Sequence, residues 1–206
     1  MLQIWGRPNS INVQKVMWTV AELGLAHERH DVGGPFGGLD TPEFKALNPN
    51  GTIPVLKDGD VVLWESNAIV RYLLAKHSAG KMWPTDVVAR AEADRWMDWQ
   101  AASTIIDLLA VFFGLIRTPE PERDMVKINQ SLANLNRMMG VVDGHLADRT
   151  WLSGDQMTMA DIAVGTLVYR WSEMPIDRPE LANVARYYAM LQERAPFRDH
   201  VMIPLS

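Results

Sequence analysis

The sequence contains no cysteine among its 206 residues. The chain therefore cannot form a disulfide bond of its own, and thiol–disulfide exchange through a protein sulfur is excluded. Chains without cysteine fit the reducing cytoplasm, where we expect this protein to act. If the chemistry involves a thiol, a ligand has to supply it.

Positive charge and long apolar runs are also scarce. The formal net charge is −5, which argues against nucleic acid or an anionic membrane surface as the main partner. No apolar run approaches the ~20 residues of a membrane-spanning helix, and the first residues do not resemble a secretory signal. We therefore expect no nucleic-acid partner and no membrane. With 48% hydrophobic and 22% charged residues, the composition is that of a globular protein with a core.

The stretch from Asn50 to Leu56 combines an Asn-Gly turn signal with the apolar run Ile-Pro-Val-Leu. Pro54 cannot donate a hydrogen bond to a sheet, so it belongs at the start of a strand or on an exposed edge. The proline also biases Ile53 toward extended geometry. The N–H and C=O of Ile53 can then pair with a peptide-like ligand, in the manner of an added strand.

Glu65 and Ser66 stand at the start of an amphipathic helix with an apolar stripe of Ile69, Tyr72 and Leu73. The free N–H groups and the positive dipole end of a helix start favour a carboxylate, and the side chain of Glu65 suits an ammonium group. The predicted ligand carries both charges of an amino acid at one end and a peptide in its middle. Taken alone, each motif is more simply explained by an ordinary strand-start proline and an ordinary helix cap.

Hydrophobic periodicity predicts alternating strands and helices in the N-terminal part of the chain. The expected order is β-α-β-α-β-β-α, with a parallel start and an antiparallel hairpin, which is an α/β pattern. Strands are expected at residues 2–5, 26–32, 53–56 and 61–64, and helices start near residues 12, 41 and 65.

Beyond a break in periodicity at residues 79–86, the sequence predicts only helices. Apolar residues between 128 and 146 alternate at spacings of three and four, which suits a helical bundle. Thr158 and Asp161 have the spacing of a capping box, which we interpret as structural. Helices are expected at residues 87–113, 120–147, 158–171 and 179–193, with a short one near the end.

Ser10, followed by Ile53-Pro54 and Glu65-Ser66 at this spacing, resembles the glutathione transferase family. The motif is similar to that of bacterial serine- or asparagine-type members with a theta- or delta-like N-terminal half. The resemblance implies a cytoplasmic homodimer that uses glutathione as co-substrate and conjugates it to an apolar electrophile, as in detoxification.

The resemblance also implies two domains. Residues 1–78 would form a thioredoxin-like α/β domain that binds glutathione, residues 79–86 a linker, and residues 87–206 an all-α helical bundle that contains the electrophile pocket. A cross-dimer contribution from Asp94, on the long helix, is a further expectation.

Ser10 and Asn12 are the expected catalytic residues. A hydroxyl at the positive end of a helix can donate to an anion and stabilise the thiolate of glutathione. Considered without the resemblance, Ser10 is an N-cap of the first helix. Asn12 stands where serine-type relatives commonly have a proline, so the division of labour between the two side chains stays open. No tyrosine precedes Tyr72, which excludes the tyrosine-type mechanism.

The remaining site residues also follow from the resemblance. A cis bond is expected between Ile53 and Pro54, and no metal is expected. Glutathione would be bound by Thr52, Ile53, Pro54, Glu65, Ser66 and Asn67. The electrophile pocket would be lined by Leu109, Phe112, Phe113, Arg117 and Trp171.

Two other classes of function stay open. One is a glutathione-dependent isomerase, dehalogenase or peroxidase. The other is a non-catalytic binding or regulatory protein with the transferase fold. The presence of Ser10, Ile53-Pro54 and Glu65-Ser66 together favours an enzyme, because non-catalytic relatives often lose the residues that hold the ligand.

Overall fold

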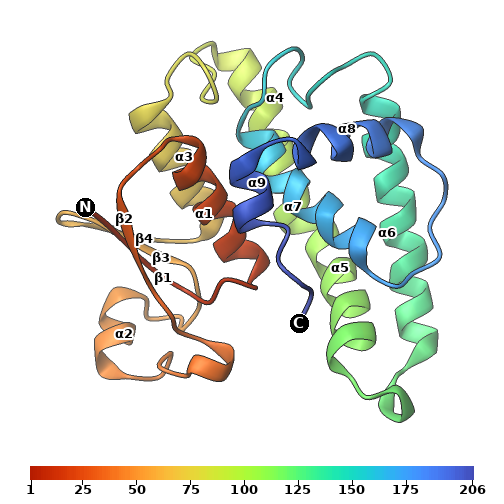
Figure 1. Cartoon of the computed structure of the whole chain (residues 1–206), viewed down its shortest axis with the longest axis horizontal. Helices are drawn as coiled ribbons and strands as arrows, with labels where there is room; N and C mark the ends of the chain where they lie inside the picture. The colour runs from red at the N-terminus through yellow and green to blue at the C-terminus, as the bar shows by residue number, and fades with distance from the viewer.

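Four short strands form a mixed sheet in the N-terminal part of the computed structural model, which describes residues 1–206 (Figure 1). The strand order is β2-β1-β3-β4. β1 and β2 are parallel, whereas β3 is antiparallel to both β1 and β4. The strands are β1 (Leu2–Trp5), β2 (His27–His30), β3 (Val55–Asp58) and β4 (Val61–Trp64).

Helices cover both faces of this sheet (Figure 1). α1 (Ile11–Glu22) and α3 (Ser66–His77) contact one another on one face, and α2 (Pro42–Leu47) lies on the other. Leu2 and Ile4 alternate with more exposed residues along β1 and pack into the core formed with α1 and α3. The α/β order predicted from the sequence is confirmed, with β2 shorter than expected.

The bond between Ile53 and Pro54 is cis, as predicted. The strand that was expected to start at Ile53 instead starts at Val55. Pro54 has no N–H to donate to β1, so regular pairing begins only after it. Pro54 is buried and Ile53 is half-buried just outside the sheet.

The C-terminal part is entirely helical, and α7 runs through its centre with every side chain from Met159 to Trp171 buried. The apolar seam expected between residues 128 and 146 is buried, with Leu132 only partly so. One π-helical segment interrupts the long helix that was expected at 87–113, and a second extends it to Arg117. The helices are α4 (Val87–Asp98), η2 (Trp99–Thr104, π), α5 (Ile105–Phe112), η3 (Phe113–Arg117, π), α6 (Met125–His145), α7 (Met159–Glu173), α8 (Ala182–Gln192) and α9 (Ala195–His200), with short 3-10 turns η1 (Gly34–Phe36) and η4 (Glu120–Glu122).

α1 joins the two parts, because it contacts α3, α7 and α9 and shares a core with the sheet. Gly165 of α7 lies against the indole ring of Trp18 of α1, where an added Cβ would come within 2.9 Å of ring carbons. Trp18 is fully buried. The absence of a side chain at Gly165 therefore permits the close approach of the two helices.

The helical run Val87–Arg117 is long and apolar enough, by length and composition alone, to cross a membrane. This corrects the expectation that no run of the chain approaches that length. A core helix of a globular protein passes the same test, and here α4 contacts α7 while α5 contacts α6.

Candidate functional site

Ser10 occupies the N-cap position of α1, but its side chain makes no capping hydrogen bond. The residue is half-buried and borders a small cavity of about 110 Å³. A hydroxyl at this position therefore keeps its O–H for a ligand, while the N-terminus of α1 adds a positive potential. The capping interpretation of Ser10 loses its main support, because the side chain does not bond to the helix that it precedes.

Asn12 connects the first turn of α1 with the first turn of α3. The hydroxyl of Ser66 donates to Oδ1 of Asn12 at 3.2 Å. Asn12 borders the cavity that contains Ser10 and also a second cavity of about 250 Å³ that contains Glu65 and Ser66. The two sequence motifs thus meet at adjoining cavities, with the N-termini of two helices bordering them.

Glu65 precedes α3 with a left-handed backbone conformation, at φ 69°. It is the only residue other than glycine with a positive φ, and its side chain caps nothing in the helix. Such a conformation costs on the order of 1–3 kcal/mol and persists where the surroundings impose it, often at functional sites. The side chain of Glu65 is exposed, borders the larger cavity and forms no ion pair.

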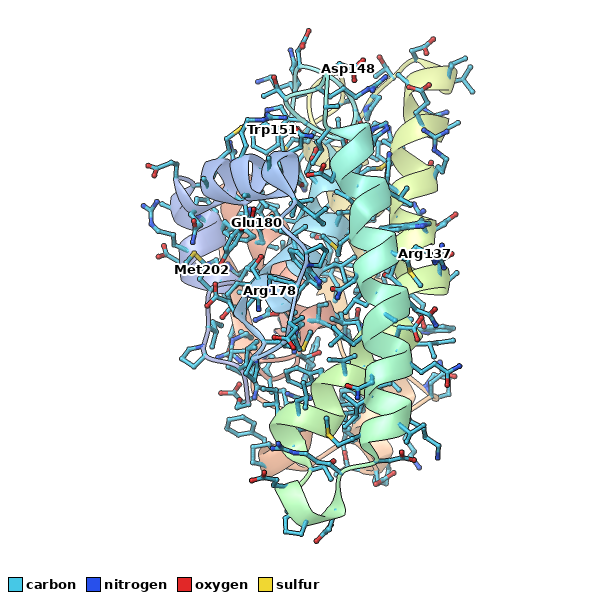
Figure 2. The ribbon with its side chains drawn as sticks, turned by 90° about the vertical axis from the view of Figure 1, so that its right-hand side faces the viewer. Arg137, Asp148, Trp151, Arg178, Glu180 and Met202 are labelled. Atoms are coloured by element: carbon cyan, nitrogen blue, oxygen red, sulfur yellow. The ribbon has the colours of Figure 1, made fainter.

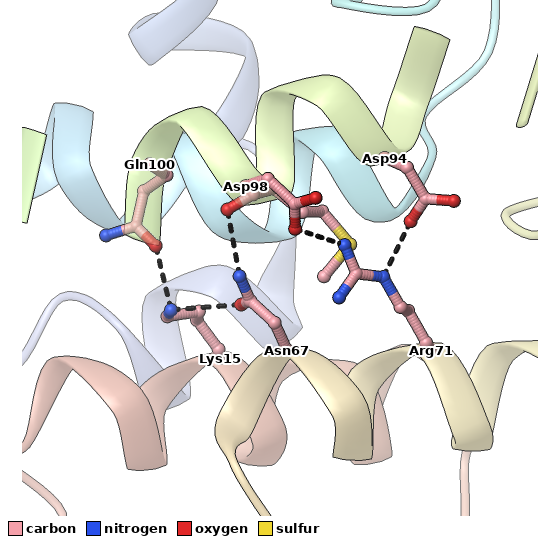
Figure 3. Close-up of polar contacts among 7 residues, drawn as sticks. Lys15, Asn67, Arg71, Asp94, Asp98 and Gln100 are labelled. Carbon is pink, nitrogen blue, oxygen red and sulfur yellow. Dashed lines mark hydrogen bonds and ion pairs between the residues drawn. The ribbon is translucent and has the colours of Figure 1, made fainter. Parts of the chain in front are cut away.

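Lys15 is a buried cation beneath this cavity, and sequence reasoning missed it. Its ammonium group donates to Oδ1 of Asn67 at 3.1 Å and to Oε1 of Gln100 at 2.8 Å (Figure 3). Burial lowers the pKa of Lys15 to about 7, and the charge of Glu65 acts in the opposite direction. The available signal was its position on α1, four residues after the buried Ile11 and on the same face.

The side chain of Asn67 is bonded on both sides within the protein, because it also donates to the carbonyl oxygen of Met97 at 2.9 Å. Arg71, one turn further along α3, pairs with Asp94 and Asp98 of α4, each at 2.6 Å (Figure 3). Asn67 and Arg71 thus fix α3 against α4. Asp94, for which a cross-dimer contribution was expected, pairs with Arg71 within the chain.

Thr52 and Ile53 precede β3. The carbonyl oxygen and hydroxyl of Thr52 accept hydrogen bonds from the Asn48 amide at 2.8 and 3.1 Å. By contrast, neither the N–H nor the C=O of Ile53 has a partner within the chain. An unpaired donor and acceptor next to a strand are what a peptide-like ligand requires for strand addition.

The cavity beside Ser10 contains four of the five residues expected in the electrophile pocket. Leu109 and Phe112 of α5 and Phe113 and Arg117 of η3 all border it. Arg7 and Arg170 border it as well, and sequence reasoning missed both. The lining is therefore less apolar than expected.

The structure does not bring Trp171 to this cavity. Its indole N–H donates to Oδ1 of Asn136 at 2.8 Å, and the residue borders a different cavity, between α7 and α8, that includes Arg178. Figure 2 shows Arg178 and Glu180 on the segment that leads from α7 to α8, beside α6. Trp171 follows Arg170 directly in α7, so the two side chains leave the helix in different directions.

Comparison with known proteins gives matches over the whole chain. Residues 9–76 match the glutathione S-transferase N-terminal domain and residues 126–189 its C-terminal domain. Glutathione S-transferase GstB of Escherichia coli is 39% identical, with all of both chains covered. Glutathione S-transferase 3 of Zea mays is 33% identical over 78% of this chain and 73% of its own.

Solved structures give the same result. A theta class glutathione S-transferase from Xanthomonas axonopodis pv. citri, crystallised with glutathione bound, has a TM-score of 0.96 and 45% identity over 100% of this chain and 99% of its own. With both domain families matched and a relative of this identity over its full length, the chain belongs to the glutathione S-transferase family.

Proposed function

We propose that the two adjoining cavities are the active site of a glutathione transferase in which Ser10, together with Asn12, stabilises the thiolate of glutathione. The observation that carries this proposal is the uncommitted hydroxyl of Ser10 at the N-terminus of α1, beside the cavity that contains Glu65 and Ser66. The shared border at Asn12 would allow one ligand to reach both cavities.

Glutathione would lie with its γ-glutamyl end over the start of α3. Its carboxylate would accept from the N–H groups at the helix N-terminus, and the Ser66 hydroxyl would turn from Asn12 to donate to it. Its ammonium group would pair with Glu65. The cysteinyl backbone would pair with the unbonded N–H and C=O of Ile53. Thr52 and Pro54 would shape this edge, while Asn67 acts by holding α3 in place.

In the reaction, the thiol loses its proton to solvent and the thiolate attacks the electrophile. The sulfur forms the new bond, and the leaving group departs with the electron pair of the bond that breaks. The hydroxyl of Ser10 would donate to the thiolate, which lowers the pKa of the thiol and raises the reactive fraction at neutral pH. Reduced glutathione is required, which fits the cytoplasm.

The test is the pH dependence of conjugation by Ser10→Ala, Asn12→Ala and the double variant. We expect a higher apparent pKa and a lower kcat at neutral pH, with the affinity for glutathione largely kept, because the lost interaction belongs to the charged sulfur. Thr41→Ala is the control. Its hydroxyl caps α2 by accepting from the Phe44 N–H, so it should lose only stability. A double variant with normal turnover and an unshifted profile would refute the role of both side chains.

We further propose a homodimer. β4 is an edge strand of the sheet, and its Val61, Val62 and Trp64 are exposed apolar residues, as are Val87 and Val88 on α4. Exposed apolar groups on an unpaired edge are typical of surfaces that a partner covers. Sedimentation equilibrium of the wild-type chain and of Trp64→Glu tests this: the wild type should have twice the mass of the variant.

A further inference from the structure

Three guanidinium groups from three separate elements border the cavity beside Ser10. Arg7 belongs to the loop between β1 and α1, Arg117 ends η3, and Arg170 lies in α7. Figure 1 shows the C-terminal end of the chain beside the loop that contains Arg7. Residues far apart in the sequence are thus gathered at one place, with like charge.

None of the three is paired with a side-chain carboxylate, although the partner of Arg117, Ser206, is the last residue of the sequence. Arg117 donates to the main-chain oxygen of Ser206 at 2.8 Å, and Arg7 donates to the side-chain oxygen of Asn9. Arg170 donates to the main-chain oxygen of Asn9 at 2.8 Å. By contrast, two other partly buried arginines of this protein, Arg71 and Arg194, both meet carboxylates.

Arg170 is the most constrained of the three. Only 3% of it is exposed, and its Nε has no hydrogen-bond partner. Burial, together with the charges of Arg117 and Arg7, lowers the pKa of Arg170 to about 10. Buried charges in proteins are normally paired, because desolvation is otherwise uncompensated. A cation held in this way next to two others calls for an anion.

The neighbouring aromatic rings hold the guanidinium groups in position. Arg170 lies over the ring of Phe112 at 4.5 Å, and Arg117 lies over the same ring at 5.1 Å. Arg117 also lies 4.9 Å from the ring centre of Phe113. These contacts stabilise cations beside apolar surface, so the cavity offers both an apolar wall and positive charge.

We propose that the second substrate of this enzyme is an electrophile that carries an anionic group, such as a carboxylate, which Arg7, Arg117 and Arg170 bind while its apolar reactive part lies against Leu109 and Phe112 beside the thiolate. This inference rests on the proposed function and narrows the expected class from apolar to acidic electrophiles. The other source of such an anion is glutathione itself, through its glycyl carboxylate, and the experiment separates the two.

The test compares a chloronitrobenzoate with the benzamide of the same substitution pattern. In both compounds, the glutathione sulfur replaces chlorine, and chloride leaves with the bonding electrons. The two substrates therefore undergo the same reaction and differ in the charge of one substituent. Rates are divided by the uncatalysed rate with glutathione, which removes the difference in intrinsic reactivity. We expect the wild-type enzyme to have a higher normalised kcat/KM for the benzoate, by roughly tenfold or more, because charged hydrogen bonds are involved.

Arg117→Gln and Arg7→Gln should each remove most of that preference, because kcat/KM falls much more for the benzoate than for the benzamide. Both side chains are at least partly exposed, so the variants should fold, which the unfolding midpoint checks. Arg178→Gln is the matched control, because Arg178 also lies over an aromatic ring, that of Trp171 at 5.6 Å, and borders a different cavity. It should keep the wild-type preference.

Each other outcome has a distinct meaning. Equal normalised rates for the two electrophiles in the wild type overturn the inference and leave the proposed function intact. A raised KM for glutathione in Arg117→Gln and Arg7→Gln, with both electrophiles, assigns the arginines to the glycyl carboxylate of glutathione and also overturns the inference. Conjugation of neither compound, nor of neutral electrophiles, refutes the proposed function instead. Calorimetry of the wild-type enzyme with unreactive nitrobenzoate and nitrobenzamide repeats the comparison without a variant, and tighter binding of the benzoate is expected.

Discussion

Glu65 combines an exposed carboxylate with a left-handed backbone, and each property leads to its own measurement. Glu65→Ala should weaken glutathione binding at least about tenfold, because a charge-assisted hydrogen bond is lost. Glu65→Gly should weaken binding equally but raise the free energy of unfolding, by about 1 kcal/mol relative to Glu65→Ala, because glycine tolerates positive φ. Calorimetry and urea unfolding measure the two. Unchanged affinity in the folded Ala variant would contradict the assignment of Glu65.

Lys15 makes stability depend on pH in a defined direction. Its folded pKa of about 7 lies below the ordinary value of 10.5, so the unfolded chain binds more protons between these values. The contribution of Lys15 to the free energy of unfolding should therefore rise from pH 7 toward pH 10. The charged groups that act on it are Glu65, which raises the pKa, and Arg71, which lowers it.

Lys15→Met should remove that rise. Its free energy of unfolding should therefore exceed that of the wild type by the largest amount below pH 7. Urea unfolding at several pH values measures this. Lys57→Met on β3 is the comparison, because it makes the same substitution at a partly exposed position outside the site. A wild type and a Lys15→Met variant with parallel pH curves would show that Lys15 stays protonated throughout.

At the residue scale, the sequence located the groups that stand beside local signals. Ser10 precedes a helix and Glu65 another, and each signal lies within a few residues of the group that it identifies. Lys15 and Arg170 were not found, because their significance comes from burial under helices far along the chain. Arg170 borders the same cavity as Ser10, although the two residues are 160 positions apart in the sequence.

Among the elements, α7 depends most on a single side chain. Asp161 closes the capping box at its start by accepting from the Thr158 N–H at 2.8 Å. It also accepts from the Leu152 N–H at 3.1 Å and from the Tyr187 hydroxyl at 3.0 Å. Burial raises the pKa of Asp161 to about 6, so its ionised form depends on these donors.

Asp161→Ala should lower the free energy of unfolding by roughly 3 kcal/mol or more, because it leaves buried donors unpaired. Asp161→Asn should cost less, since one acceptor oxygen is kept. Denaturant unfolding measures both, and Asp124→Ala, at the exposed start of α6, is the comparison. If Asp161→Ala and Asp124→Ala were equally destabilising, the buried network would contribute nothing beyond an ordinary cap.

The sequence predicted the kind and approximate position of most elements, because their apolar periodicity is regular. The π-helical turns of η2 and η3 were not predicted. A π turn shifts the register by about one residue, which apolar periodicity over a single turn does not reveal. A polar contact of the site lies in this segment: Gln100 of η2 is fully buried and accepts a hydrogen bond from the ammonium group of Lys15.

At the scale of the whole molecule, the approach of α1 to α7 sets how the two parts fit. Gly165→Ala should be destabilising by about 1–3 kcal/mol, because the new methyl group meets the buried ring of Trp18 and the ring has no space to move. Gly140→Ala in α6 meets nothing within 4 Å and should instead stabilise by about 0.5–1 kcal/mol. Thermal unfolding of both variants gives the comparison. A neutral Gly165→Ala would mean that the two helices separate at little cost.

How the two parts face one another could not be predicted from the sequence. Periodicity identifies which face of α1 is apolar, but not that α7 and α9 cover it. The site lies where this arrangement matters, since Ser10 comes from one part and Leu109, Phe112 and Arg117 from the other.

Asn12 borders both cavities while it accepts a hydrogen bond from Ser66. A ligand that turns this amide in one cavity changes what the amide presents to the other. The two binding equilibria are then linked through one side chain. Thermodynamic reciprocity requires that glutathione change the affinity for the second substrate by the same factor as the second substrate changes the affinity for glutathione. Asn12 is thus a side chain through which binding in one cavity can change binding in the other.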